Sequence, residues 1–278
     1  MNIKRLKDSA FFRVRSAGRE IAWWRQSVRS LENWSEVITD RLRTKFGVKL
    51  KCNELKLRDG LAFSLHPGST GLFQVYLEVF PWSLYDGDPL FKLKKGDTVI
   101  DIGANIGLFT LKAARLVGEG RVYAYEPCSM HFNLLSENVR RNNQKNVQVF
   151  KEAVWKNSDA LELLYSNDTE PKDTSIFQMG GEQRETVGAV TLEEIFRENK
   201  IGSCDFLKMD CEGAEYDILF YAPDHVLKSI KKIAMEWHKF DASHVPEKLA
   251  EFLTKKGFTI IGEPAWADTT GYLYAVRQ

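Results

Sequence analysis

Apolar residues follow two repeating patterns from about residue 97 to the end of the chain. Short apolar runs alternate with stretches in which apolar residues return every three or four positions, as they do from Ile106 to Val117 before Gly118. The runs predict buried strands at residues 98–103, 121–127, 147–154, 204–213 and 230–239. Strands that alternate with helices predict a parallel, doubly wound α/β sheet.

The end of the chain breaks this alternation. Thr191 and Glu194 have the spacing of a capping box, so they mark one more helix before the fourth strand. The last two apolar runs, 258–263 and 271–277, have no helix between them. Their spacing predicts one antiparallel strand at the end of the sheet.

The chain before residue 97 divides into two segments. In residues 53–96, an Asp59-Gly60 turn predicts a hairpin that leads into the core or covers it as a lid. Residues 1–52 predict a basic helical extension, since twelve Lys or Arg against five Asp or Glu give its first fifty residues a charge of about +7. This extension is interpreted as a helical cap on the core at 97–278. A surface that contacts an anionic substrate, a membrane or a partner subunit is the alternative.

Composition narrows the classes of partner. The whole chain has 39 basic and 38 acidic residues, so its charge gives no general attraction for nucleic acid and no DNA partner is expected. No apolar run approaches the roughly 18 residues that span a membrane, and the N-terminus lacks the apolar core of a signal peptide. We therefore expect a cytoplasmic protein.

The stretch DTVIDIGANIG at residues 97–107 points to a ligand. A dinucleotide site has the spacing G-x-G-x-x-G, whereas Gly103 and Gly107 are separated by three residues and preceded by Asp101. A carboxylate at this strand end would repel pyrophosphate and suits the cationic amino group of a methionine moiety. The pattern predicts S-adenosylmethionine (SAM), bound by Asp101, Gly103, Ala104, Asn105 and Gly107.

Two further acids fall at the ends of the next strands. Glu126-Pro127 ends the second strand, where a carboxylate can accept hydrogen bonds from both ribose hydroxyls. Glu152-Ala153 ends the third strand, where the adenine edge is expected. We therefore add these four residues to the predicted cofactor site.

Several motifs together resemble the FkbM family of SAM-dependent methyltransferases. They are DTVIDIGANIGLFTL, RVYAYEP, NLLSENVRRNNQKNVQVFKEAV, FLKMDCEGAEYDIL and AMEWH, with LKLRDGLAF and EVFPWSLYD upstream. The resemblance covers roughly residues 53–278. It implies a class I methyltransferase fold, Rossmann-like, with a seven-stranded mostly parallel sheet. It also implies O-methylation of a sugar, glycan or natural-product hydroxyl, with S-adenosylhomocysteine as product.

A polar cluster near the fourth and fifth strands is the candidate for chemistry. Lys208, Asp210 and Glu212 alternate, so they should point to one side of their strand, and Glu236 and His238 alternate on the next. Neighbouring strands would gather them around one pocket that includes Asp210 as a cofactor contact. His238 has the intrinsic pKa of a general base for an alcohol, with Asp210 or Glu236 to orient it or act in its place.

Three alternatives stay open at this stage. Asp210, Glu212, Glu236 and His238 offer the ligands of a divalent metal, although no metal is expected because the fifth strand lacks the Asp-Asn pair of catechol-type enzymes. The basic N-terminus keeps an RNA, in particular a tRNA, methyltransferase as an alternative. A non-catalytic SAM-binding protein is the third.

Overall fold

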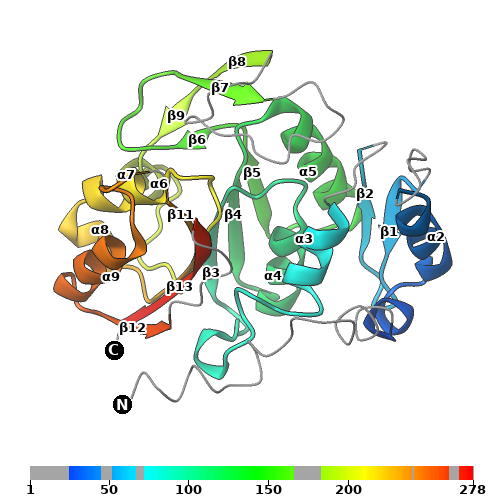
Figure 1. Cartoon of the computed structure of the whole chain (residues 1–278). Helices are drawn as coiled ribbons and strands as arrows, with labels where there is room; N and C mark the ends of the chain where they lie inside the picture. The colour runs from blue at the N-terminus through cyan, green and yellow to red at the C-terminus, as the bar shows by residue number, and fades with distance from the viewer. Residues whose placement is uncertain are drawn as a thin grey trace.

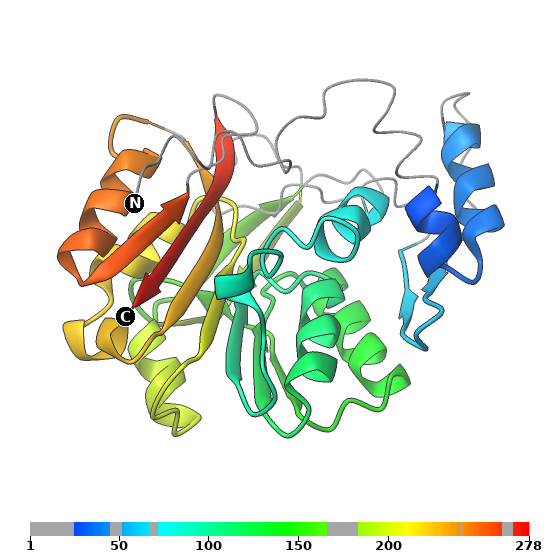
Figure 2. The same ribbon diagram turned by 90° about the horizontal axis from the view of Figure 1, so that it is seen from below.

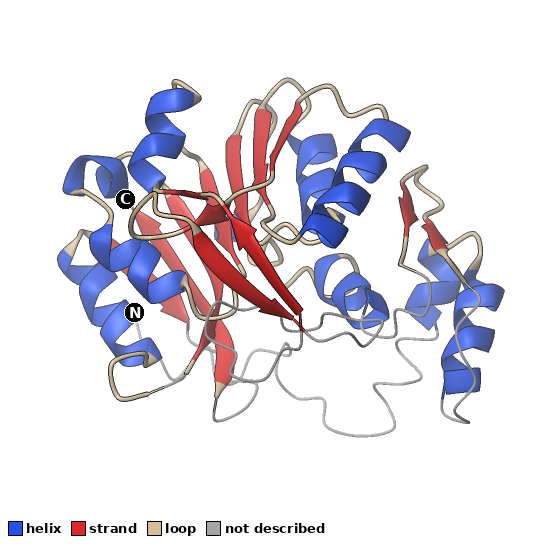
Figure 3. Ribbon diagram, turned by 90° about the horizontal axis from the view of Figure 1, so that it is seen from above, coloured by secondary structure: helices blue, strands red, loops and turns tan. Residues whose placement is uncertain are grey.

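The computed structural model describes residues 25–44, 52–66, 72–165, 183–239, 241–262 and 269–277. Its centre is a seven-stranded sheet with helices on both faces, in the order β12-β13-β11-β10-β3-β4-β5 (Figure 3). The strands are β3 (Thr98–Ile102), β4 (Arg121–Tyr125), β5 (Val147–Phe150), β10 (Phe206–Met209), β11 (Lys232–His238), β12 (Phe258–Gly262) and β13 (Thr270–Arg277). Neighbours are parallel except around β13, which is antiparallel to both β11 and β12. This confirms the predicted class I methyltransferase fold.

The helices divide between the two faces of the sheet (Figures 1 and 2). One face carries α3 (Leu72–Val79), α4 (Leu108–Val117) and α5 (Ser129–Arg141). The other carries α6 (Leu192–Glu198), α7 (Glu215–Tyr221), α8 (Asp224–Lys228) and α9 (Pro246–Lys255). Two of the predicted helix boundaries hold, since Gly118 caps α4 and Thr191 forms a capping box with Glu194 at α6.

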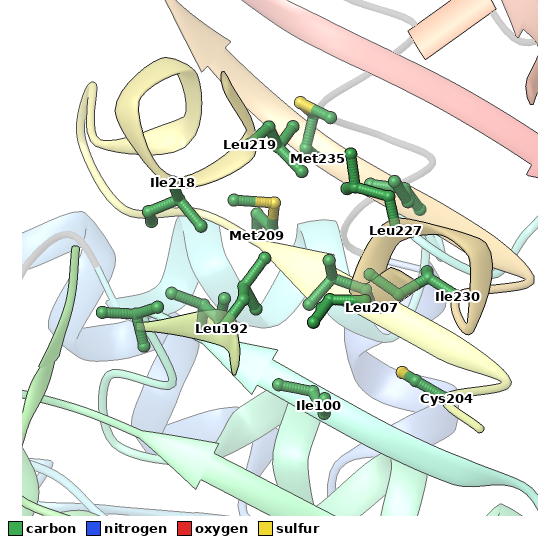
Figure 4. Close-up of a cluster of buried hydrophobic side chains, with 14 of the residues drawn as sticks. Ile100, Leu192, Cys204, Leu207, Met209, Ile218, Leu219, Leu227, Ile230 and Met235 are labelled. Carbon is green, nitrogen blue, oxygen red and sulfur yellow. The ribbon is translucent and has the colours of Figure 1, made fainter. Parts of the chain in front are cut away.

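The sheet has an apolar core on each side because side chains alternate along every strand. Ile100, Leu207 and Met235 pack with α7 and α8 in the core that Figure 4 shows. Their neighbours Val99 and Phe206 pack on the opposite face, against α4 and the segment that includes α3. By the same alternation, Asp101, Lys208 and Glu236 point toward this second face, close to where the parallel strands end.

The third predicted strand is shorter than expected. It was predicted to run through residues 147–154, but β5 ends at Phe150. Its partner β4 is followed by Pro127, which has no amide hydrogen to extend the ladder. The chain then leaves the sheet, and β6 (Ala153–Val154) pairs in parallel with β9 (Ala189–Val190).

A hairpin outside the main sheet was not predicted. It consists of β7 (Leu161–Tyr165) and β8 (Gln183–Val187), which pair antiparallel and lie beyond the ends of β4 and β5 (Figure 1). The polar sequence QRETV gives β8 no apolar run, which explains why the pattern did not reveal it. Glu185 on β8 accepts hydrogen bonds from the amide and hydroxyl of Ser129, which joins the hairpin to α5.

The segment before the core contains the predicted hairpin. It is formed by β1 (Glu54–Lys56) and β2 (Ala62–Ser64), joined through Asp59-Gly60. Side-chain oxygens of Asn142 and Asn138 on α5 accept from the amides of Ala62 and Ser64, at 2.8 and 2.6 Å. In the N-terminal extension, residues 25–30 and α2 (Trp34–Thr44) are helical, while residues 1–24 and 45–51 lie outside the described residues. None of the described helices is long and apolar enough to cross a membrane.

Candidate active site

The turn after β3 passes very close to the end of β10. Gly103 has φ +73°, and a Cβ at this position would lie 1.8 Å from the carbonyl oxygen of Asp210. Only glycine fits here, because any side chain would displace the neighbouring backbone. The amides of Gly103 and Ala104 both donate to the carbonyl oxygen of Tyr125, at 3.1 and 3.0 Å. Gly103, Ala104 and Asn105 thus form a fixed wall of a cavity at the carboxyl ends of the strands.

Glu126 is the buried acid of this cavity. It is 5% exposed, and its Oε2 and Oε1 accept from the amides of Asn105 and Cys128, at 2.8 and 3.0 Å. Two backbone donors fix the orientation of the carboxylate. Pro127 and His131 also line the cavity, with His131 Nδ1 3.8 Å from Glu126 Oε1. No sequence pattern marks His131 as a site residue, because its place in the wall depends on how α5 packs against the sheet.

The next part of the cavity wall is largely apolar. Glu152, Ala153 and Val154 line it, together with Leu163 from the hairpin β7–β8. Burial raises the pKa of Glu152. An apolar wall with one carboxyl group suits the adenine that the sequence places here. Leu163 was not among the predicted residues because its strand lies outside the main sheet.

Lys208 and Asp101 form a buried ion pair below the cavity. They are direct neighbours in the register of β10 and β3, and Lys208 Nζ lies 3.1 Å from Asp101 Oδ1. The same ammonium donates to the carbonyl oxygen of Gly103 at 2.7 Å, while Thr110 Oγ1 donates to Asp101 Oδ2 at 2.6 Å. Burial opposes the charge of Lys208, but Asp101 and Asp210 outweigh it and raise the pKa of the lysine.

The direct contact predicted from Asp101 to the cofactor stays a prediction, and the surroundings of Asp101 do not favour it. The side chain is fully buried and is not among the described residues that line the cavity. Its carboxylate forms an ion pair with Lys208, and Lys208 does line the cavity. Gly107 also lies away from the wall, and a Cβ there would lie 2.7 Å from Leu135 of α5. Its lack of a side chain serves helix packing and a turn at φ +92°, where α4 begins.

Asp210 and Glu236 form a close carboxyl pair in the cavity wall. Their oxygens lie within 4.8 Å of each other. Glu236 accepts from Thr270 Oγ1 at 3.0 Å and from the Tyr272 hydroxyl at 3.2 Å. Burial and the charge of Asp210 raise the pKa of Glu236 to about 8. Burial and the nearby carboxyl group of Asp210 thus both favour the protonated form of Glu236.

His238 lies between two other carboxyl groups. Its Nδ1 is 3.3 Å from Oε1 of Glu215, whose side chain is fully buried, and its Nε2 is 3.3 Å from Oε2 of Glu212. Burial opposes the charged imidazolium, but Glu215, Glu212 and Glu236 outweigh it and raise the pKa of His238 to about 10. Glu212 lines the cavity, and burial raises its pKa to about 8. His238 itself is not among the described lining residues.

The general base predicted at His238 stays a prediction, but the surroundings of this residue do not favour the role. Both ring nitrogens contact carboxyl groups, and the raised pKa favours the protonated imidazole, which has no lone pair to accept a proton. His238 links Glu215 to Glu212. The predicted strand for Lys208, Asp210 and Glu212 also ends early, at Met209, and Glu212 sits in the following turn with φ +51°.

Two groups of described residues have the composition of a metal site. They are Glu126, Cys128 and His131, and Asp210, Glu236 and His238. Both ring nitrogens of His238, the atoms that would bind a metal, already contact carboxyl groups of Glu212 and Glu215. The contacts of His238 therefore favour a proton-sharing network over metal ligation.

The family model described as the methyltransferase FkbM domain matches residues 101–260. The chain belongs to the FkbM methyltransferase family. It is 25% identical over 236 residues to methyltransferase sdnD of Sordaria araneosa, covering 73% of this chain and 89% of that protein. It is 27% identical over 219 residues to 31-O-demethyl-FK506 methyltransferase FkbM of Streptomyces tacrolimicus, covering 67% and 83%.

Solved structures with a similar fold include other methyltransferases. A precorrin-6y C5,15-methyltransferase of Geobacter metallireducens GS-15 has a TM-score of 0.44 at 14% identity, over 68% of this chain and 84% of that one. A SAM-dependent methyltransferase of Aquifex aeolicus has a TM-score of 0.40 at 18% identity, over 73% and 93%. The fold assignment rests on the strand order itself, and family membership makes the protein a SAM-dependent methyltransferase.

The matched FkbM domain does not contain the whole cavity wall. Four lining residues, Val75, Glu78, Val79 and Tyr85, come from α3 and the loop after it, before residue 101. The upstream motif EVFPWSLYD includes three of them, yet its sequence alone does not reveal which side chains face the core. These residues complete the cavity beside Asp210 and Glu236.

Proposed function

We propose that the protein transfers a methyl group from SAM to a hydroxyl group of a sugar, glycan or natural-product acceptor. When bound, SAM supplies an electrophilic methyl group on a positively charged sulfur. The residues of the chain have to orient the hydroxyl and take up its proton as the C–O bond forms. The observation that carries the proposal is the carboxyl pair Asp210–Glu236 in the cavity wall, within reach of an acceptor.

The cavity fits the cofactor. Gly103 keeps one wall free of side chains, and Glu126 offers a carboxylate that two backbone amides hold in one orientation. Glu152, Ala153 and Leu163 offer a pocket for a flat ring. These residues would hold the adenosine part of SAM, and of S-adenosylhomocysteine after transfer.

Asp210 is the better base of the carboxyl pair. Burial and the charge of Asp210 raise the pKa of Glu236 to about 8, which favours a neutral Glu236. Asp210 accepts a hydrogen bond from Tyr85, and Lys208 lies beside it. In this role Asp210 accepts the hydroxyl proton, Glu236 stays neutral, and Lys208 stabilises the negative charge of the wall.

The charge of the wall supports an uncharged acceptor over RNA. Glu78, Asp210, Glu212 and Glu236 line this part of the cavity, and Lys208 is turned toward Asp101 and Gly103. Carboxyl groups accept hydrogen bonds from sugar or alcohol hydroxyls, whereas they repel phosphates. The basic N-terminal extension is the feature that favours RNA, and most of it lies outside the described residues.

A turnover assay with methyl-labelled SAM tests the proposal. The acceptors are simple glycosides, polyketide alcohols and total RNA, and products are analysed for methyl ethers by mass spectrometry. Asp210→Asn should lower kcat by about 10²–10⁴-fold, the range for a positioned base. The exposed Asp159→Asn serves as the matched control and should retain full activity.

Three outcomes would contradict parts of this proposal. Label that enters only RNA would favour the RNA methyltransferase, and SAM binding without any turnover would favour the non-catalytic protein. Treatment with EDTA should leave the rate unchanged. If EDTA abolishes activity and Mg²⁺ restores it, Asp210, Glu236 and His238 act as metal ligands.

A further inference from the structure

Tyr85 reaches the cavity from outside the matched FkbM domain. It lies in the loop after α3 and is 3% exposed. Its ring packs edge-on against Phe109 of α4 and Tyr272 of β13, with centroid distances of 5.4 and 5.7 Å. Contacts with two different elements hold the ring in one position, so the direction of its hydroxyl group is fixed.

The hydroxyl of Tyr85 donates to the carboxylate of Asp210. The distance from the tyrosine oxygen to Asp210 Oδ2 is 2.9 Å. Lys208 Nζ lies 3.8 Å from the same oxygen and 5.3 Å from the centre of the Tyr85 ring. Burial and the charge of Asp210 raise the pKa of Tyr85 well above its usual value, so the phenol keeps its proton and remains a donor.

The loop that carries Tyr85 is anchored to the core. Lys112 of α4 donates to the carbonyl oxygen of Val79 at 2.7 Å and to Ser83 Oγ at 3.1 Å. Its Nζ also forms an ion pair with Asp86 Oδ1 at 2.6 Å, and both side chains are largely buried. Residues before and after Tyr85 in the chain, within 79–86, are therefore anchored to α4 and hold the tyrosine in place.

We propose that Tyr85 is a positioning residue for methyl transfer, which orients Asp210 to accept the proton of the acceptor hydroxyl. This inference rests on the proposed function, since it needs Asp210 to be the base. A donor to an ionised carboxylate favours the ionised form and restricts its rotation. Residues before the FkbM domain then belong to the active site and not only to its cover.

Several titratable groups surround the carboxylate of Asp210. The titratable groups that interact with it or lie within 4.8 Å come from the strands, the turn and the preceding loop: Tyr85, Lys208, Cys211, Glu212, Glu236, His238 and Tyr272. Tyr85 and Lys208 are the two that directly contact Oδ2. Removal of the Tyr85 hydroxyl should therefore act on Asp210 without altering the other charges.

Tyr85→Phe tests the proposal, with Tyr123→Phe as the matched control. Tyr123 is a buried tyrosine of β4 that packs in the core with Ile100 and Leu207 and is not among the described residues that line the cavity, so the control removes the same group at a distance from Asp210. In Tyr85→Phe, kcat should fall about tenfold, as expected for a hydrogen bond to a charged group. The acidic limb of the pH–rate profile should move up by about one pH unit, while SAM affinity stays within about twofold.

A measurement without acceptor separates this inference from the proposed function. Carboxyl NMR of ¹³C-labelled aspartate, with the Asp210 signal identified through Asp210→Asn, should show its titration at higher pH in Tyr85→Phe than in wild type. If no hydroxyl acceptor is turned over but this signal shifts, the proposed function fails and the orientation of Asp210 by Tyr85 stands. Unchanged titration and unchanged kcat in Tyr85→Phe, or equal losses in Tyr123→Phe, would overturn the inference.

Discussion

At the scale of single residues, we expect different carboxyl groups of the cavity to serve cofactor binding and proton transfer. Glu126 is oriented by backbone amides alone, so its contribution should be confined to the cofactor. Asp210 and Glu236 lie close together, and His238 contacts Glu212. These four carboxyl groups thus have three different environments, and we expect their roles to differ accordingly.

Glu126→Ala should weaken SAM binding by about 1.5–3 kcal/mol, the range for hydrogen bonds to a charged group. Isothermal titration calorimetry measures the effect. Glu119→Ala, at an exposed position in the loop after α4, is the control and should bind SAM like wild type. Equal affinity in both variants would remove the ribose assignment of Glu126.

His238→Ala should lower kcat by about tenfold and retain the acidic limb of the pH–rate profile, because His238 positions Glu212 and takes up no proton. It should also lower the thermal midpoint, since Glu215 then lies buried without its cation. Adding Glu215→Gln to His238→Ala should recover part of that stability, a coupling that a double-mutant cycle measures. Loss of the acidic limb in His238→Ala would restore the histidine as the base.

At the scale of elements, the site depends on how closely β3 and β10 approach. Sequence patterns predicted both strands, because their apolar runs are bounded by turn residues and acids. They also placed Glu126 and Glu152 at the carboxyl ends of strands, where parallel neighbours bring them together. Patterns could not show that Asp101 lies beneath Lys208, since this depends on the register between two strands that are more than 100 residues apart.

Gly103→Ala should destabilise the protein and weaken SAM binding together. The left-handed backbone alone costs about 1–2 kcal/mol for a residue with a Cβ, and the contact with the Asp210 carbonyl adds to it. The thermal midpoint should therefore fall by about 4 °C or more. Gly202→Ala is the control, because nothing lies within 4 Å of a Cβ there. A Gly103→Ala protein as stable as this control would contradict the close approach.

At the scale of the whole molecule, the cavity depends on parts of the chain that sequence reasoning did not bring together. Tyr85 and Glu78 reach it from the segment before the core, and Leu163 from a separate hairpin. These contacts join residues far apart in the chain, and neither segment has a periodicity that identifies its inward side chains. The main sheet was predictable because its strands repeat one pattern.

The contribution of Glu212 and Glu236 to the stability of the cofactor-free protein should fall as pH rises from 4.5 to about 8. Glu212 and Glu236 have folded-state pKa values of about 8 against an ordinary 4.5, so the folded state binds more protons than the unfolded state in this window. Their stabilisation is present below pH 4.5 and is lost as pH rises through about 8. Glu236→Gln should flatten this decline, which thermal unfolding at several pH values measures. A wild-type midpoint that rises across the same window would contradict the assignment.

The division of the cavity wall between two stretches of chain has a consequence for how acceptor preference can diversify. The residues proposed to hold SAM lie within residues 101–260, whereas α3 and its loop contribute Val75, Glu78 and Val79 to the cavity wall. Substitutions in that short segment can reshape the acceptor side while the methyl donor remains bound as before. Chimeras that exchange residues 72–91 between relatives would inherit acceptor choice from one parent and cofactor affinity from the other. The same segment is where a directed search for new acceptors should begin.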